Sequence, residues 1–182
     1  MHKLATLLLA GAALTAAVRA DELVVAPHPP EIQAELPGAR HGATATLRFL
    51  GMRIYDARVW SHAPIVGDGA AQALAIEIHY ARPLSGSRIA SRSLDEMKHI
   101  GHVTDAQAQR WLQSMARLFP DVRPGDRITG VQRPGHSACF YVNGSAVGDI
   151  VDPDFVRLFF GIWLSPRTSE PALRAQLIGA AR

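Results

Sequence analysis

The sequence contains very little cysteine, which limits how its fold can be stabilised. Cys139 is the only cysteine among 182 residues, so no disulfide can form within the chain. It lies in an apolar stretch, where a thiol usually packs as a small hydrophobic side chain. We therefore expect a hydrophobic core to hold the fold, with Cys139 buried in a strand and without a nucleophilic role.

Clustered charge is also missing. The chain has 19 basic residues, nearly all of them arginine, and 16 acidic residues. The two kinds are interspersed along the sequence, without the basic patch that is typical of nucleic-acid binding. A nucleic-acid partner is therefore not expected.

The usual patterns of metal ligands and nucleophiles are absent as well. His99 and His102 are three residues apart, but Gly101 is expected to end a helix between them, so they cannot share a helical face. The other histidines are dispersed, and no G-x-S-x-G motif occurs. The sequence thus predicts no metal site, no cofactor and no hydrolase chemistry.

The longest uncharged apolar run lies at the N-terminus. It covers residues 4–18, follows the basic Lys3 and precedes a Val18-Arg19-Ala20 segment that resembles a signal peptidase site. The run is short for a transmembrane helix, although an uncleaved anchor is the alternative. We expect a cleavable signal peptide over residues 1–20, a periplasmic mature protein and no stable membrane insertion after cleavage. Cleavage would lower the formal net charge from +3 to +1, because Lys3 and Arg19 are lost.

The rest of the chain, residues 21–182, has the length of one domain. After a Pro-rich connection at residues 27–30, hydrophobic periodicity predicts an α+β domain, in which helices cover one face of a mostly antiparallel sheet. Strands are expected at residues 22–26, 44–50, 53–60, 73–80, 126–132, 137–142 and 145–150. Helices are expected at residues 87–100, 104–119, 153–164 and 169–179.

Local signals support several of these elements. Residues 73–80 alternate between apolar and other side chains, which indicates a strand with one buried and one solvated face. Asn143-Gly144 is the preferred pair for a two-residue hairpin turn. Thr104 and Gln107 form a capping-box signature at the start of a helix.

The helix predicted after Asp152 is apolar around most of its circumference. Asp152 has the chemistry of an N-cap, and Pro153 suits the first helical position. Phe155, Leu158, Phe159 and Ile162 share one stripe, while Val156, Phe160 and Trp163 extend apolar surface beyond it. Such a helix is either enclosed by protein or lines a cavity for an apolar ligand.

Six stretches of the sequence resemble the chalcone isomerase-like proteins of bacteria. They span nearly all of residues 21–182 in the order of that family. The resemblance implies an open-faced β-sandwich, in which a large antiparallel sheet is covered by a helical layer with a ligand cleft between them. The stretches are RFLGMRIYDARVW (48–60), IHYARPLSG (78–86), DEMKHIG (95–101), FPDVRPGDRITG (119–130), FYVNGSAVGDI (140–150) and DPDFVRLFFGIWLSPRTSEPALRAQLIG (152–179).

The resemblance does not extend to the catalytic groups of plant chalcone isomerases. In those enzymes an arginine holds the phenolate, while a tyrosine, two threonines and an asparagine surround the reacting ketone. The positions of the threonines fall at Leu50 and near Ile162, the tyrosine near Ser85 and the asparagine near Arg92. Only the arginine has candidates, which are Arg40 and Arg48. Because each lost group typically costs a factor of about 10² to 10³ in rate, we expect no efficient catalysis by the same mechanism.

Non-catalytic members of the superfamily bind fatty acids, with an arginine and a tyrosine on the carboxylate. The resemblance implies that the protein is a non-catalytic binder of an apolar small molecule, such as a fatty acid or a phenolic carboxylate. Two alternatives are an isomerase of chalcone-like enones with a rearranged site, and an envelope interaction module. The candidate ligand-binding residues are Arg48, Arg40 and Arg92 as cations, Tyr55 and Tyr80 as hydroxyl donors, and Phe159, Ile162 and Trp163 as the apolar wall. A solvated Arg48 or Arg40, and a Tyr55 that belongs only to the core, are the simpler interpretations of the same residues.

Overall fold

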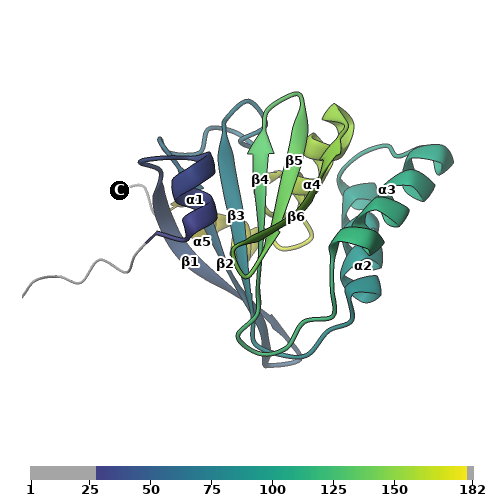
Figure 1. Ribbon diagram of the computed structural model, residues 1–182, viewed down its shortest axis with the longest axis horizontal. Helices are drawn as coiled ribbons and strands as arrows, with labels where there is room; N and C mark the ends of the chain where they lie inside the picture. Colours follow the sequence, from purple (N-terminus) through teal and green to yellow (C-terminus); the bar gives the residue numbers. More distant parts are fainter. Residues whose placement is uncertain (1–27, 180–182) are drawn as a thin grey trace, which may run out of the picture.

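The computed structural model describes residues 28–179 (Figure 1). The expected signal peptide and the strand expected at residues 22–26 lie outside the described residues. Within that range, no helix combines the length and the hydropathy needed to cross a membrane.

The described chain builds one six-stranded sheet, whose strands lie side by side in the order of the sequence. Every neighbouring pair is antiparallel. The predicted strands from residue 44 onward are thus confirmed. The strands are β1 (Arg40–Phe49), β2 (Met52–Ser61), β3 (Leu74–Tyr80), β4 (Arg127–Arg133), β5 (Ser137–Val142) and β6 (Ser145–Val151).

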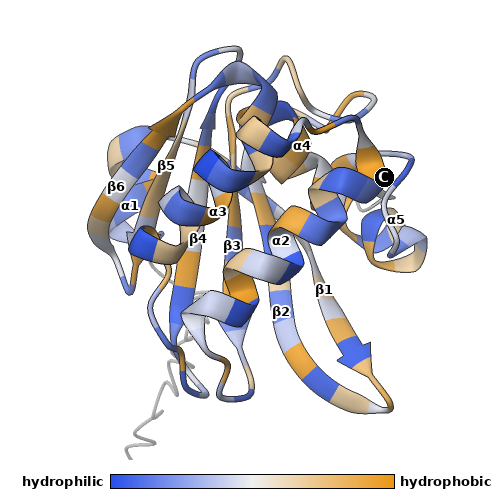
Figure 2. Ribbon diagram, turned by 90° about the vertical axis from the view of Figure 1, so that its right-hand side faces the viewer, coloured by the Kyte–Doolittle hydropathy of each residue, from blue (hydrophilic) through white to orange (hydrophobic). Residues whose placement is uncertain are grey.

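Most of the helices cover one face of this sheet (Figures 1 and 2). In the described chain, the helices on this inner face are α2 (Gly86–Ile100), α3 (Asp105–Leu118), α4 (Pro153–Leu164) and α5 (Pro171–Gly179), and the short helix on the opposite, outer face is α1 (Pro30–Glu35). This arrangement confirms the predicted fold class, an α+β open-faced sandwich with a helical layer.

The main core lies between the inner face of the sheet and the helical layer. Its centre is aromatic: the rings of Phe155 and Phe159 on α4 stack at 5.2 Å, and Phe140 of β5 meets Phe159 edge-on at the same distance. Asp152 caps α4 as predicted, because its carboxylate accepts hydrogen bonds from the amides of Asp154 and Phe155. The capping box of Thr104 and Gln107 is also present. The apolar α4 is therefore enclosed by protein.

The outer helix α1 was not predicted. Residues 27–30 were expected to form only a connection, but Pro30 stands at the first helical position, where its missing N–H breaks no hydrogen bond. Ile32 then packs with Leu36 against Trp60 and other side chains of the outer face. The expectation that one face of β3 is solvated is wrong for the same reason, since Glu77 on that face is only 1% exposed.

Two further local expectations need correction. Gly101 ends α2 in an extended conformation rather than as a left-handed cap, with φ −155°. A Cβ at Gly101 would lie 2.7 Å from Leu158 Cδ2 of α4, so any other residue there would force the Leu158 side chain to shift. Arg40 is the first residue of β1, opposite Ser61 of β2, rather than part of a loop.

Candidate functional site

A cavity of about 440 Å³ lies between the inner face of the sheet and helices α2, α4 and α5. Most of its wall is apolar. The side chains that contribute to this part of the wall, besides those discussed below, include Leu47, Ile54, Ile76, Ile78, Leu84, Ile89, Phe119, Ile128, Phe140 and Leu173. Gly130 of β4 also lines the cavity, and a Cβ there would lie 3.3 Å from the Phe140 ring. The cavity is therefore suited to an apolar molecule.

Two tyrosines from neighbouring strands bring hydroxyl groups to the wall. Tyr55 of β2 and Tyr80 of β3 are directly opposite in the sheet, and their ring centroids are 6.3 Å apart. The indole Nε1 of Trp163 donates a hydrogen bond of 3.1 Å to the Tyr55 hydroxyl oxygen. Because that oxygen acts as acceptor, the Tyr55 hydrogen is free to donate to a ligand.

Burial keeps both hydroxyls neutral. It raises the pKa of Tyr55 to about 12, although the hydrogen bond from Trp163 opposes the shift. Burial and the proximity of Tyr55 raise the pKa of Tyr80 well above its ordinary value. Within residues 28–179 the Tyr80 hydroxyl has no hydrogen-bond partner. At neutral pH the pair therefore offers two donors and no negative charge.

Three arginines lie where the cavity meets solvent. Arg48 is near the end of β1, while Arg88 and Arg92 are one turn apart on α2, and all three are exposed. Arg92 forms an ion pair with the nearly buried Glu96, which also accepts a hydrogen bond of 2.7 Å from Ser169 Oγ. The charge of Arg92 is thus compensated by its own neighbour.

Within the part of the chain that the structure describes, Arg48 and Arg88 have no such acidic partner. The Nη1 of Arg48 donates only to the carbonyl oxygen of Gly51, at 3.3 Å. No ion pair of Arg48 or Arg88 occurs among the described residues. These two guanidinium groups are therefore the cations best able to receive an anionic group at the opening.

The structure brings together all but one of the residues that the sequence suggested. Arg40 is the exception, since it begins β1 at the end away from the hairpin turn and does not line the cavity. Arg88 was missed, although its spacing of four from Arg92 on a predicted helix was a usable signal. The predicted residues that line the cavity are Arg48, Tyr55, Tyr80, Arg92, Phe159, Ile162 and Trp163.

The positions that would carry the plant isomerase groups are only partly assembled around the cavity, which Arg48, Arg92 and Ile162 line. Leu50 is 82% exposed in the turn between β1 and β2, and Ser85 precedes α2; neither of them lines the cavity. Ile162 does line it but offers no hydrogen bond. The described residues therefore do not reproduce the catalytic set of those enzymes.

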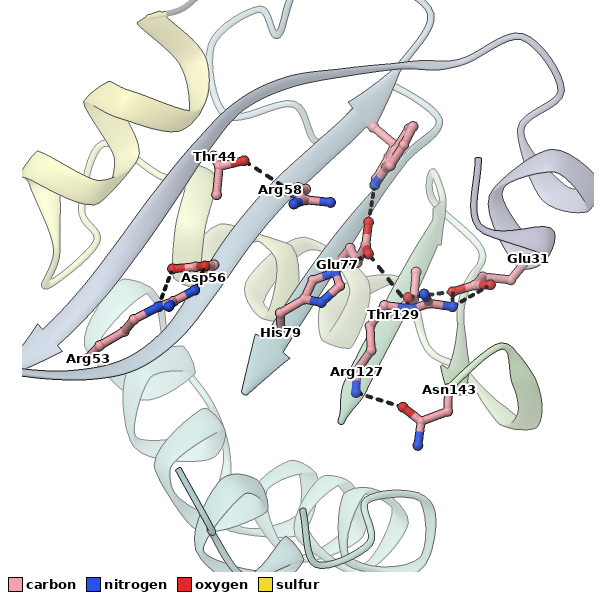
Figure 3. Close-up of polar contacts among 11 residues, drawn as sticks. Glu31, Thr44, Arg53, Asp56, Arg58, Glu77, His79, Arg127, Thr129 and Asn143 are labelled. Carbon is pink, nitrogen blue, oxygen red and sulfur yellow. Dashed lines mark hydrogen bonds and ion pairs between the residues drawn. The ribbon is translucent and has the colours of Figure 1, made fainter. Parts of the chain in front are cut away.

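A second group of polar side chains lies on the outer face of the sheet (Figure 3). Glu77 of β3 accepts a hydrogen bond from the Trp60 indole and forms an ion pair with His79. The carboxylates of Glu77 and of Glu31 on α1 are both almost completely buried there; Glu31 is only 2% exposed. Glu31 receives hydrogen bonds of 2.8 Å and 3.0 Å from Arg127 and one of 2.8 Å from Thr129.

This polar group attaches α1 to the sheet. Glu35, at the end of the same helix, accepts a hydrogen bond of 2.6 Å from the Tyr141 hydroxyl and one of 2.9 Å from Arg133. The hydrogen bond to Tyr141, followed by that of Arg133, lowers the pKa of Glu35 in spite of partial burial. Most of these side chains are paired with one another, although the buried Nε of Arg127 has no hydrogen-bond partner among the described residues and lies 3.8 Å from Glu77. Their arrangement indicates support of the fold rather than a binding site.

Comparison with known proteins identifies the family of this chain. A sequence model described as chalcone isomerase-like matches residues 58–179, a range that excludes Arg48 and Tyr55. An uncharacterized protein of Haemophilus influenzae is 28% identical over 109 residues, which cover 60% of this chain and 53% of that protein. The chain thus spans about half the length of the curated relative that it matches.

The fold is also found in a plant protein. The crystal structure of a fatty-acid binding protein of Arabidopsis thaliana superposes with a TM-score of 0.60 over 78% of this chain and 87% of that one, at 12% sequence identity. At this identity the likeness concerns the fold alone. Because the family match covers most of the chain, from the second half of β2 through α5, the protein belongs to the chalcone isomerase-like family.

Proposed function

We propose that the protein binds an apolar small molecule with one anionic group, such as a fatty acid or a phenolic carboxylate, without converting it. The observation that carries this proposal is the apolar cavity with exposed arginines at its opening. Its volume of about 440 Å³ lies within the range of about 300–1,000 Å³ that is usual for small-molecule sites. The plant fatty-acid binding protein with the same fold supports this proposal by analogy.

The charges suggest how such a ligand is oriented. A carboxylate deep in the cavity would lose its hydration and meet neutral hydroxyl donors such as those of Tyr55 and Tyr80, which is costly. At the opening it keeps solvent contact and meets Arg48 and Arg88. We therefore place the anionic group at the opening and the apolar part against Phe159, Ile162 and Trp163.

The cavity also separates this proposal from its alternatives. An interaction module with a packed cleft would leave no such volume between sheet and helices. An isomerase would need polar groups placed where charge develops, whereas Leu50 lies outside the cavity and Ile162 is apolar. A binding role requires neither a packed cleft nor polar groups at these positions.

Native mass spectrometry tests the proposal. The protein is purified from its own host without detergent, and its mass is recorded under native and denaturing conditions. We expect an extra mass of a few hundred daltons that is released on denaturation, together with saturable uptake of palmitate or a hydroxycinnamate by the apo protein. Absence of both would refute the proposal, and steady turnover of a chalcone would favour the isomerase instead.

We also propose export to the periplasm through cleavage after Ala20. The support is the charge and hydropathy pattern of residues 1–20. Fractionation of the host followed by intact-mass measurement tests it. A periplasmic species that begins at Asp21 is expected, and a cytoplasmic species that retains Met1 would contradict it.

A further inference from the structure

The turn between β1 and β2 exposes three large apolar side chains. Phe49, Leu50 and Met52 are 63%, 82% and 42% exposed, respectively. In Figure 2 this hairpin forms the lower right corner of the molecule, at the edge of the sheet. We call these three residues the hairpin tip. A cluster of this kind on a projecting loop indicates a contact with something apolar.

The backbone conformation at Leu50 is unfavourable for leucine, so the stability of the fold alone does not explain a leucine at this position. Leu50 and Gly51 have φ values of 48° and 77°, and Asn143 and Gly144 in the β5–β6 turn have nearly the same values, 49° and 88°. Asn is favoured in this left-handed position, whereas a leucine there is strained. The β1–β2 turn thus has a strained, solvent-exposed leucine at the position where the β5–β6 turn has Asn143.

The charge beside the tip is positive. Arg48 precedes Phe49 directly and has no ion pair among the described residues, and Arg53 follows Met52 and is paired with Asp56. Phe49 and Arg48 also line the cavity, so the tip and the cavity opening are continuous. Apolar side chains flanked by an uncompensated arginine match the boundary between acyl chains and anionic headgroups.

A second protein molecule fits this tip less well. Three side chains of this size bury about 500 Å² at most, whereas a stable protein interface buries about 800 Å² on each partner. Binding to a bilayer does not require an interface of that area, because a few inserted apolar side chains and nearby cations suffice for reversible binding.

We propose that the hairpin tip docks the protein on a lipid bilayer that contains anionic lipids. Phe49, Leu50 and Met52 enter the boundary between headgroups and acyl chains, and Arg48 lies at the level of the phosphates. Docking would place the cavity opening next to the bilayer. This inference goes beyond ligand binding and rests on the exposed tip alone, so it is tested without a ligand.

Co-sedimentation with vesicles tests the docking. The mature chain is mixed with vesicles of phosphatidylcholine and phosphatidylglycerol in equal parts, or of phosphatidylcholine alone. We expect binding to the mixed vesicles, and a decrease of about tenfold or more in the partition coefficient for Leu50→Asn combined with Met52→Thr. Neither residue lines the cavity, and Leu50→Asn suits the turn.

The matched control is Val66→Thr, which changes another apolar side chain that is 77% exposed, in the loop between β2 and β3. It should bind vesicles as the unchanged protein does. A second measurement does not require a variant with reduced binding. In the presence of the mixed vesicles, the tryptophan fluorescence of Leu50→Trp should shift to the blue and be quenched by brominated lipid. Equal binding by the double variant, no binding by the unchanged protein, or a dimer that Leu50→Asn dissociates would overturn the proposal.

Discussion

At the residue scale, the two arginines that α2 brings to the opening differ in what they offer a ligand. Arg92 is already paired with Glu96, whereas Arg88 has no acidic partner within residues 28–179. We predict that Arg88→Gln weakens fatty-acid binding about fivefold, because an exposed charge pair contributes about 1 kcal/mol. Calorimetric titration with palmitate measures this.

The control for this prediction is Arg117→Gln, which removes the same charge from α3 at an exposed position outside the cavity. It should leave the affinity unchanged. An equal loss of affinity in both variants would mean that net charge, not the position of Arg88, is responsible.

A second prediction at the residue scale concerns the buried tyrosines and the pH dependence of stability. Because burial raises the pKa of Tyr55 to about 12, folding favours its neutral form, and this contribution to stability is complete below the ordinary pKa of about 10. It is lost as the pH rises through the folded-state pKa. We expect the free energy of unfolding to fall between pH 10 and 12, with a smaller slope in Tyr55→Phe. Chemical denaturation at each pH measures it, and an unchanged slope would contradict the assignment.

At the scale of elements, α1 is held to the sheet by the carboxylates of Glu31 and Glu35 in addition to the apolar contacts of Ile32. Burial alone would raise the pKa of Glu77, but its contacts with His79, Trp60 and Arg127 outweigh burial and lower it. The pKa of Glu35 is lowered by Tyr141 and Arg133. A carboxyl group whose pKa is lowered by folding stabilises the native state above its unfolded-state pKa of about 4.3. This contribution to the free energy of unfolding is lost as the pH falls below that value.

We therefore predict that α1 detaches on acidification before the rest of the fold opens. Hydrogen exchange of residues 30–36 should accelerate below about pH 4, while the amides of β3 and β4 stay protected. Glu35→Gln should raise the exchange of α1 already at pH 7 and reduce its pH dependence. Simultaneous loss of protection in α1 and the sheet would show that α1 does not open separately.

The elements also show what could be read from the sequence. The strands from residue 44 onward, the Asn143-Gly144 turn and the caps at Thr104 and Asp152 follow from local patterns, and the structure has them. Helix α1 was missed, because its six residues are held by contacts with side chains about 100 positions away, such as Thr129. No local pattern contains that information. The burial of the outer face of β3 was missed with it.

At the scale of the whole molecule, the apolar character of α4 indicated either enclosure or a cavity wall, and the structure shows both. Phe155 and Leu158 are fully buried in the core, while Phe159, Ile162 and Trp163 also line the cavity. The sequence could suggest the residues of such a wall. It could not predict the volume, because the space depends on how α2, α4 and α5 pack together over the sheet.

This difference along α4 leads to a prediction about the cavity as a whole. Ile162 and Leu158 lie one turn apart, but only Ile162 faces the cavity. Ile162→Trp places extra volume in free space, so we expect the apo protein to keep its stability. Leu158→Trp overfills a packed site, and a loss of about 1–3 kcal/mol is expected. Thermal or chemical denaturation compares the two variants.

The same pair of variants tests whether the cavity holds the ligand. A ligand at a hundred times its Kd stabilises the native state by about 2.7 kcal/mol. The unchanged protein should gain this amount with palmitate, and Leu158→Trp should gain nearly as much, because its cavity is still open. Ile162→Trp should gain nothing, since the indole occupies the space of the acyl chain. A full gain in Ile162→Trp would place the ligand elsewhere on the molecule, because filling the cavity would then have left binding intact.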